Sequence, residues 1–338
     1  MSRYLRQTLF PGIGESGQQK LLSAHVVIIG CGATGTVIAN HLARAGIGQL
    51  TIVDRDFIEL NNLQRQLLFD EQDLAEQLPK AIAATRKLRR INSEIKVEGI
   101  VTDVNAENIE TLIGGADLVM DGTDNFETRY LLNDACIKHN IPWIYTGAVS
   151  SYGMSQTIIP SETACLRCLI ETMPLPGSSA TCDTAGVVGS VVGTVASIST
   201  TEAIKLLVGD GEINRGIIYV DLWINSFEQF NNSGPRPNCP TCQQHEFEFL
   251  NQNLVSQTVN LCGRNSIQIH PLQKQNLPLA DLANQLAKVG QIIAQNEYLI
   301  RFSIDSYEIT LFLNGRAIIK GTENEAIARS LYARYIGN

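Results

Sequence analysis

The feature that most constrains this chain is an apolar run that ends in a glycine loop. Residues 24–30 read as a fully buried parallel strand, and residues 34–45 carry apolar side chains at helical spacing. The sequence GCGATG between them supplies Gly30, Gly32 and Gly35. These glycines permit a tight turn and close backbone approach, and the first amides of the helix face an anion. The sequence therefore predicts a phosphate-binding turn; a glycine turn that only packs helix against strand is the alternative.

An acidic residue stands where a nucleotide ribose is bound in such folds. Asp54 follows Gly35 by 19 residues and closes the next expected strand, 50–53. A carboxylate at this place accepts hydrogen bonds from ribose hydroxyls. Strand, loop, helix and acid together favour nucleotide binding, and they do not distinguish NAD from ATP.

Strands and helices alternate over the first half of the chain, which predicts an α/β fold with a Rossmann-like, doubly wound and mostly parallel sheet. The expected strands are 24–30, 50–53, 95–100, 117–120 and 141–145, and the expected helices are 34–45, 80–91, 105–113 and 129–139. Strands at 154–159, 216–222 and 225–230 predict an antiparallel extension. A turn-rich crossover at 160–186 and an apolar helix at 187–208 precede its last two strands.

The composition changes again near residue 246. Helices are expected at 279–288 and 325–335, strands at 299–304, 307–313 and 317–319, and Asn314-Gly315 is a strong hairpin signal. We therefore expect a nucleotide-binding domain at 1–245 and a small C-terminal α+β domain at 246–338. The second domain has no recognisable active-site motif.

Composition and charge exclude several classes of protein. The 338 residues are 44% hydrophobic and 18% charged, as in a folded protein of about two domains. A net charge of −8 repels nucleic acid and anionic membranes, so neither is an expected partner. The first residues form no apolar signal core, which predicts a cytoplasmic protein with reduced thiols. The helix at 187–208 is nearly long enough to span a bilayer, but its polar residues favour a buried helix of a soluble domain.

Amide and cationic residues after Asp54 argue for ATP and against NAD. Asn62 and Arg65 lie in the sequence NNLQRQ, and Lys80 follows a proline. A dehydrogenase has no evident use for them, whereas an enzyme that releases pyrophosphate develops charge on the bridging oxygen that Arg or Lys offsets. Taken singly, Arg65 and Lys80 are better explained as solvated surface charges. Their occurrence together favours a phosphate site.

Asp124 follows the expected strand at 117–120. Ligands sit at the carboxyl ends of strands in such sheets. Its carboxylate is suited to Mg²⁺, with triphosphate oxygens and waters completing the shell. The side chain is equally suited to capping the helix that follows. Both interpretations stay open.

Four cysteines form two C-x-x-C pairs, Cys165 with Cys168 and Cys239 with Cys242. Two knuckles of two thiolates are the usual arrangement of a closed, tetrahedral structural zinc site. A single pair could be redox-active, and four unrelated buried thiols are a further alternative, but the double pair favours zinc. The metal would link the crossover at 160–186 to the end of the first domain.

Cys182 is different, because it lies in a polar stretch just before the apolar helix. A thiol near a helix start can have a lowered pKa and act as a nucleophile. A structural cysteine explains the local sequence equally well. Cys31, Cys136 and Cys262 are interpreted as packing residues.

The ordered set of these motifs resembles the ThiF/MoeB/HesA family, bacterial relatives of ubiquitin-activating enzymes. The resemblance covers about residues 3–245. Its markers are Arg3-Tyr4-Leu5-Arg6-Gln7, the glycine loop, Asn62-Leu63-Gln64-Arg65-Gln66, Pro79-Lys80, Thr123-Asp124-Asn125, both C-x-x-C pairs, and Thr181-Cys182 with Ala185-Gly186.

The resemblance implies an ATP-dependent adenylyltransferase. Its substrate would be the C-terminal glycine carboxylate of a ubiquitin-like sulfur carrier protein of ThiS or MoaD type, in thiamine thiazole or molybdopterin cofactor biosynthesis. Attack of the carboxylate on the α-phosphorus gives an acyl-adenylate and pyrophosphate. The carboxylate is already ionised, so positioning and charge stabilisation suffice and no general base is needed.

The resemblance also implies residue roles. Gly32 and Asp54 hold the nucleotide, Asp124 binds Mg²⁺, and the phosphates are held by Asn62, Arg65 and Lys80. Arg6 matches an arginine that reaches into the partner subunit's site, which implies a symmetric homodimer, and Arg129 is a weaker ligand candidate. Cys182 matches a thiol that ThiF-type enzymes use in sulfur transfer, whereas MoeB-type enzymes only make the adenylate.

Two features depart from the family pattern. The stretch from Arg65 to Lys80 is slightly longer, and the shortest members lack residues after 246. That tail has no cysteine with the surroundings of a rhodanese active site, so sulfurtransferase activity is not expected there. The alternative functions are an NAD-dependent oxidoreductase, a peptide-adenylating relative and a non-catalytic, zinc-stapled binding module.

Overall fold

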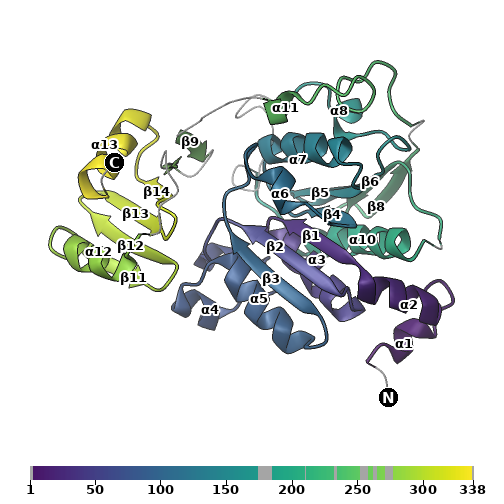
Figure 1. The fold of residues 1–338 in the computed structure, drawn as a ribbon, viewed down its shortest axis with the longest axis horizontal. Coiled ribbons are helices and arrows are strands. Elements are labelled where there is room, and N and C mark those ends of the chain that lie inside the picture. Colours follow the sequence, from purple (N-terminus) through teal and green to yellow (C-terminus); the bar gives the residue numbers. More distant parts are fainter. Residues whose placement is uncertain are drawn as a thin grey trace. The chain divides into compact units, whose positions relative to one another are not determined.

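The computed structural model describes residues 3–173, 185–209, 211–231, 234–251, 258–261, 265–270 and 277–336 (Figure 1). The backbone forms two compact units. Unit 1 comprises Met1–Ala75 and Pro79–Asn253, and unit 2 comprises Glu76–Leu78 and Leu254–Asn338. The chain therefore enters unit 2 briefly after Ala75, and enters it again after Asn253.

Unit 1 is built on an 8-stranded sheet in the order β3-β2-β1-β4-β5-β6-β7-β8. Strands β1 to β5 run parallel, and β6, β7 and β8 continue the sheet in antiparallel fashion. This confirms the predicted Rossmann-like sheet with an antiparallel extension. The strands are β1 His25–Ile29, β2 Gln49–Asp54, β3 Lys96–Val101, β4 Leu118–Asp121, β5 Trp143–Val149, β6 Tyr152–Ile158, β7 Ile217–Asp221 and β8 Ser226–Phe230.

Burial on both faces explains why β1 reads as a continuous apolar run. Its last four residues, Val26 to Ile29, are at most 1% exposed. Strand order reverses beside β1, with β2 on one side and β4 on the other. The carboxyl ends of β1 and β4 therefore flank the crevice in which doubly wound sheets bind ligands.

Helices cover both faces of this sheet (Figure 1). The longer helices are α2 Gly14–Ser23, α3 Ala33–Ala45, α5 Lys80–Ile91, α7 Phe126–Lys138 and α10 Gly189–Val208; the short ones are α1 Leu5–Thr8, α4 Glu71–Glu76, α6 Ile109–Leu112, α8 Leu166–Leu169 and α11 Glu248–Asn251. The sequence did not predict α1, α2, α4, α8 or α11. Most are a single turn or little more, and α2 has two glycines and a polar run, so they lack a clear apolar period.

Helix α10 is long and apolar enough to cross a membrane by length and composition, and half of its most apolar stretch is buried. It packs against α3 and against strands β5 and β6. Val191 and Val195 pack with Ile218 and Val220 of β7. These are the contacts of the core helix that the sequence predicts.

Unit 2 holds a 6-stranded antiparallel sheet in the order β11-β12-β13-β14-β10-β9. Its apolar residues form a core with two helices, as predicted for an α+β unit. Asn314-Gly315 makes the expected turn between β13 and β14, whereas β9, β10 and β11 were not predicted. The elements are β9 Thr258–Leu261, β10 Ser266–Ile269, α12 Leu279–Leu286, β11 Gln291–Gln295, β12 Leu299–Ile304, β13 Tyr307–Phe312, β14 Ala317–Lys320 and α13 Glu325–Tyr335.

Candidate functional site

The glycine loop turns the chain sharply from β1 into α3. Gly30 has a φ of +91°, in the left-handed region that favours glycine. A Cβ at Gly35 would lie 2.1 Å from the Gly30 carbonyl oxygen, whereas a Cβ at Gly32 would meet only the Gly122 carbonyl oxygen at 3.8 Å. Packing therefore explains Gly30 and Gly35 but not Gly32. The space beside Gly32 suits close approach of a ligand to the backbone.

The Asp54 carboxylate is fixed against this loop at the end of β2. Its Oδ2 accepts a hydrogen bond from the Cys31 backbone N–H at 2.6 Å, and its Oδ1 accepts one from the Asp56 N–H at 2.7 Å. Burial raises the pKa of Asp54, and the nearby positive charge of Lys80 opposes that rise. The arrangement places a carboxylate where a ribose would meet the loop.

Lys80 is the first residue of α5 and is only 5% exposed. Its backbone N–H donates to the Asp56 carbonyl oxygen at 2.9 Å, and its Nζ lies 3.4 Å from Asp56 Oδ2. The surface-charge explanation is therefore wrong for Lys80. Its charge acts on Asp54 and on Cys31 of the glycine loop, so the ammonium group is near both the acid and the loop.

Asn62 and Arg65 lie in the turn that follows. Asn62 is 4% exposed, and its Oδ1 accepts from the Glu59 N–H at 3.2 Å, which closes a capping box around a short 3₁₀ helix, Leu60–Asn62. Arg65 is half-buried and its Nη1 donates to the Asn61 carbonyl oxygen at 2.8 Å. A Cβ at Gly189 would lie 3.1 Å from the Gln64 carbonyl oxygen, so the turn rests against the start of α10.

Asp124 lies just beyond β4, and its neighbour does the capping. The Asn125 side chain accepts a hydrogen bond from the Thr128 N–H at 2.9 Å and is the N-cap of α7. The capping interpretation of Asp124 is therefore wrong. Asp124 is exposed. Burial lowers the pKa values of Arg55 and Arg129, but nearby carboxylates outweigh this effect and raise both pKa values. Asp124 is one of the weaker of these carboxylates for each arginine.

Arg129 is buried and its hydrogen bonds go to the protein. Its Nε donates to Asp121 Oδ2 at 2.9 Å, and its Nη2 donates to the carbonyl oxygens of Thr123 and Thr146 at 2.7 and 3.2 Å. The guanidinium also lies over the Tyr145 ring, 5.0 Å from its centroid. This arginine ties β4, α7 and β5 together.

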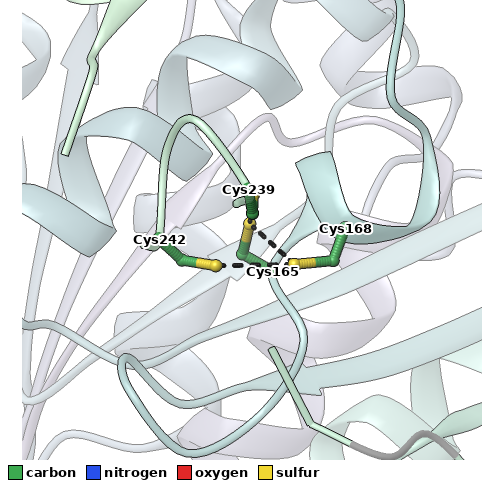
Figure 2. A group of neighbouring side chains, drawn as sticks. All are labelled: Cys165, Cys168, Cys239 and Cys242. Carbon is green, nitrogen blue, oxygen red and sulfur yellow. Dashed lines mark hydrogen bonds between the residues drawn. The ribbon is translucent and has the colours of Figure 1, made fainter. Parts of the chain in front are cut away.

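The two C-x-x-C pairs meet in space, as Figure 2 shows. The Sγ atoms of Cys165 and Cys239 are 3.7 Å apart, those of Cys168 and Cys242 are 3.4 Å apart, and all four lie within 4.8 Å of one another. These separations are too long for disulfides, whose S–S bond is about 2.0 Å. Four sulfurs at about 2.3 Å from a tetrahedral zinc would be about 3.8 Å apart. The cluster therefore fits zinc.

Buried polar contacts orient the second knuckle of this cluster. The Arg236 backbone N–H donates to Cys168 Sγ at 3.3 Å. Asp134 of α7 is fully buried and accepts hydrogen bonds from Thr241 Oγ1 at 3.1 Å and from the Phe249 N–H at 2.9 Å. The knuckle and α11 are thus both fixed to α7.

The remaining described cysteines are unsuited to nucleophilic chemistry. Cys31 and Cys136 are fully buried, and burial raises the pKa of both thiols. Both fit the predicted packing role. Cys182 and Cys262 lie outside the described residues.

Arg6 lies on a short segment that is well anchored. Tyr4 is 6% exposed and its Oη accepts a hydrogen bond from the Asn92 side chain at 2.9 Å, while Gln7 Nε2 donates to the Ala45 carbonyl oxygen at 2.8 Å. Arg6 itself is exposed on α1. The structure does not bring it into contact with the glycine loop of its own chain.

Sequence reasoning missed Asp56, which pairs with Lys80, and Asn125, which caps α7. A signal existed for each. Asp56 lies on the chain two residues after Asp54, and Asn125 is a preferred N-cap residue directly after a strand and turn.

The chain matches the ThiF family over residues 4–241. It is 45% identical over 336 residues to a Bacillus subtilis protein named sulfur carrier protein ThiS adenylyltransferase, and the match covers 99% of each chain. An Escherichia coli protein of the same name is 41% identical over 208 residues, which are 61% of this chain and 81% of the relative. The solved structure of Escherichia coli MccB with ATP has a TM-score of 0.62 at 28% identity, with 72% of this chain and 74% of MccB covered.

The match to the Bacillus subtilis protein covers nearly the whole chain, and the family match at 4–241 includes the glycine loop, the phosphate-site candidates and the first cysteine pair. The family match alone covers well over half of the sequence, and the sheet order agrees with the fold that the motifs predict. The chain belongs to the ThiF family.

Proposed function

We propose that this chain is an adenylyltransferase that uses ATP to activate the C-terminal glycine carboxylate of a ubiquitin-like sulfur carrier protein. The observation that carries the proposal is the meeting of an open glycine loop, the Asp54 carboxylate and the buried Lys80 ammonium at the carboxyl ends of β1 and β2. A site for nicotinamide has no use for a buried lysine at this place. Relatives named ThiS adenylyltransferase support the carrier as substrate, and the similarity to MccB with ATP supports the nucleotide.

The reaction requires positioning and charge stabilisation from the protein. A carboxylate oxygen of the carrier attacks the α-phosphorus, the bond from that phosphorus to the bridging oxygen breaks, and pyrophosphate leaves with the electron pair. Lys80 and Arg65 offset the charge that develops on the leaving group, and Asn62 donates to a phosphate oxygen. Gly32 allows the phosphates to approach the backbone, and Asp54 accepts from the ribose.

Two metals complete the proposal. Asp124 has an exposed carboxylate close to the crevice and is suited to Mg²⁺, which would neutralise phosphate charge. The four thiolates of the cysteine cluster would hold Zn²⁺ and leave no open coordination position, so that metal stabilises the fold and takes no part in the reaction.

In this proposal a second copy of the chain completes the ATP site. Arg6 is exposed on an anchored segment, and in the proposal it contacts a second copy of the chain in a symmetric homodimer. The enzyme would act in the cytoplasm. We propose a ThiS-type carrier and thiamine thiazole synthesis, because the relative matched over 99% of both chains carries that name. A MoaD-type carrier is the alternative.

Pyrophosphate exchange tests this function. Labelled pyrophosphate should enter ATP only when carrier, ATP and Mg²⁺ are all present, and a carrier lacking its last glycine is the matched control. The absence of exchange with both ThiS-type and MoaD-type carriers would overturn the proposal. Exchange supported by a short peptide with the carrier's C-terminal sequence would instead favour a peptide-adenylating enzyme, and tight binding of NAD would favour the oxidoreductase.

A further inference from the structure

Three residues from the first half of the sequence belong to unit 2. Glu76–Leu78 cluster with the residues from Leu254 onward, and the chain is back in unit 1 at Pro79. They lie within the stretch between Arg65 and Lys80 that is slightly longer than the family pattern. The chain therefore contributes to unit 2 at two places in the sequence, Glu76–Leu78 and Leu254–Asn338.

A side chain of unit 2 holds this segment by its backbone. Asn296 Nδ2 donates a hydrogen bond to the Gln77 carbonyl oxygen at 2.8 Å. Gln77 has a φ of +50°, a left-handed conformation that a residue with a side chain adopts only when its surroundings hold it there. Leu78, the next residue, is 5% exposed. The segment is therefore a fixed and locally strained turn.

Asn296 is itself oriented for this contact. Its Oδ1 accepts hydrogen bonds from the N–H groups of Tyr298 at 2.8 Å and Leu299 at 3.0 Å. These bonds fix the amide in the turn between β11 and β12 and direct its nitrogen to Gln77. The acceptor half of the side chain builds the turn, and the donor half binds Glu76–Leu78.

The segment that Asn296 holds leads directly to Lys80. Pro79 pairs with Phe57 in a β-bridge, and the Lys80 N–H donates to the Asp56 carbonyl oxygen. On the other side, Lys87 Nζ lies 2.5 Å from Asp70 and 2.6 Å from Asp73, which fixes the start of α4 to α5. The stretch from the start of α4 to Lys80 is consequently held at both ends, with Gln77 between them.

We propose that Asn296 is a positioning residue for Lys80: by binding the Gln77 carbonyl, unit 2 sets the path by which Lys80 enters the phosphate site. This inference rests on the proposed function, because Lys80 is a phosphate ligand only there. It gives the C-terminal unit a role in ATP binding without any catalytic group of its own.

The test separates the two halves of the Asn296 side chain. Asn296→Asp keeps the oxygen that accepts from Tyr298 and Leu299, and it replaces the donor by an oxygen that repels the Gln77 carbonyl. Asn314→Asp is the matched control, because Asn314 Oδ1 likewise accepts within a turn of unit 2, from the Arg316 N–H at 3.1 Å, and the charge change is the same. The full-length protein carries both substitutions, one at a time.

Hydrogen exchange gives a readout that does not depend on activity. In Asn296→Asp, peptides that contain the Lys80 amide should exchange about 5- to 30-fold faster, the range expected for loss of one such bond, while Asn314→Asp should match the wild type. The KM for ATP in carrier-dependent exchange should rise by a similar factor, while the KM for the carrier stays unchanged.

Each outcome decides the inference. Unchanged protection of Lys80 in Asn296→Asp would overturn it, as would an equal effect of both variants or a fall in melting temperature with no change in the KM for ATP. If the wild type shows no pyrophosphate exchange, the proposed function fails. Faster exchange of the Lys80 amide in Asn296→Asp would then still show that Asn296 holds the segment. The proposed role of Asn296 in ATP binding would be overturned together with the proposed function.

Discussion

Arg129 and Asp121 form a buried ion pair, with 2.9 Å between Nε and Oδ2, and both residues bond to Thr123, the residue before the candidate magnesium ligand Asp124. The Asp121 side chain is fully buried and the Arg129 side chain is 9% exposed. The same carboxylate accepts from Thr123 Oγ1 at 2.6 Å, so it fixes the turn that carries Asp124. The pair therefore connects the stability of the fold with the geometry of the site.

Replacing Arg129 by Ala should cost roughly 3–5 kcal/mol of unfolding free energy, because it leaves Asp121 as an uncompensated buried charge. Urea unfolding measures this loss. The double variant Arg129→Met with Asp121→Asn removes both charges, and it should be less destabilised than the single variant. A loss below about 1 kcal/mol in Arg129→Ala, the range of exposed ion pairs, would show that the pair is not buried in solution.

Gly35→Ala and Gly32→Ala should behave differently. The new methyl group at position 35 would lie 2.1 Å from the Gly30 carbonyl oxygen, so α3 must move and the protein should lose about 1–3 kcal/mol or more of stability. The methyl group at position 32 meets ordinary contacts, so that variant should fold normally and bind ATP at least about tenfold more weakly, a loss of about 1.4 kcal/mol. Thermal unfolding with and without ATP measures both effects, and undiminished ATP stabilisation of Gly32→Ala would contradict the loop's role.

Asp124→Ala should reduce carrier-dependent pyrophosphate exchange by about 100- to 1000-fold, the range seen when one group that stabilises developing charge is removed. The fold should survive, because Asn125 supplies the cap of α7. Glu127→Ala removes an exposed charge one turn later and serves as the control. Normal exchange by Asp124→Ala would eliminate it as a metal ligand.

Cys239→Ser should release zinc and lower the melting temperature, because one thiolate of the four-sulfur cluster is lost. Metal content by mass spectrometry and a thermal scan are the two measurements. Cys136→Ala, which removes a buried thiol outside the cluster, should retain the metal. An unchanged zinc content in Cys239→Ser would rule out the four-cysteine site.

Cys182→Ser should leave adenylation intact and abolish transfer of sulfur to the carrier, if this thiol has the role that the family resemblance implies. Pyrophosphate exchange and formation of the carrier thiocarboxylate, followed by mass spectrometry, distinguish the two steps. Loss of exchange would mean that Cys182 acts in adenylation and that its assignment is mistaken.

The sequence predicted the parts of the fold that depend on local pattern. Buried parallel strands such as β1 are recognisable in the sequence as apolar runs. Each cysteine pair has the spacing of zinc ligands within four consecutive residues. The glycine loop was predictable for the same reason, since its residues are adjacent in the chain. Each of these features needs no knowledge of what lies opposite in space.

Features set by distant partners could not be read from the sequence. The burial of Lys80 depends on Asp56, and that of Arg129 depends on Asp121 and on the carbonyl of Thr146. Helix α4 is too short to show an apolar period and is fixed by ion pairs to Lys87. Nothing in residues 76–78 indicates that they cluster with a unit that otherwise begins at Leu254.

The passage of the chain through unit 2 at Glu76–Leu78 changes how any shortened form of the protein must be interpreted. A protein truncated after Asn253 keeps these three residues but loses the part of unit 2 with which they cluster. The truncation therefore removes contacts of the turn that immediately precedes Lys80. Inactivity of such a fragment would be the expected result even if the missing tail never touches a substrate. Point substitutions leave the chain intact at Glu76–Leu78 and at Leu254. They are therefore better suited than truncation to determine what each unit contributes to activity.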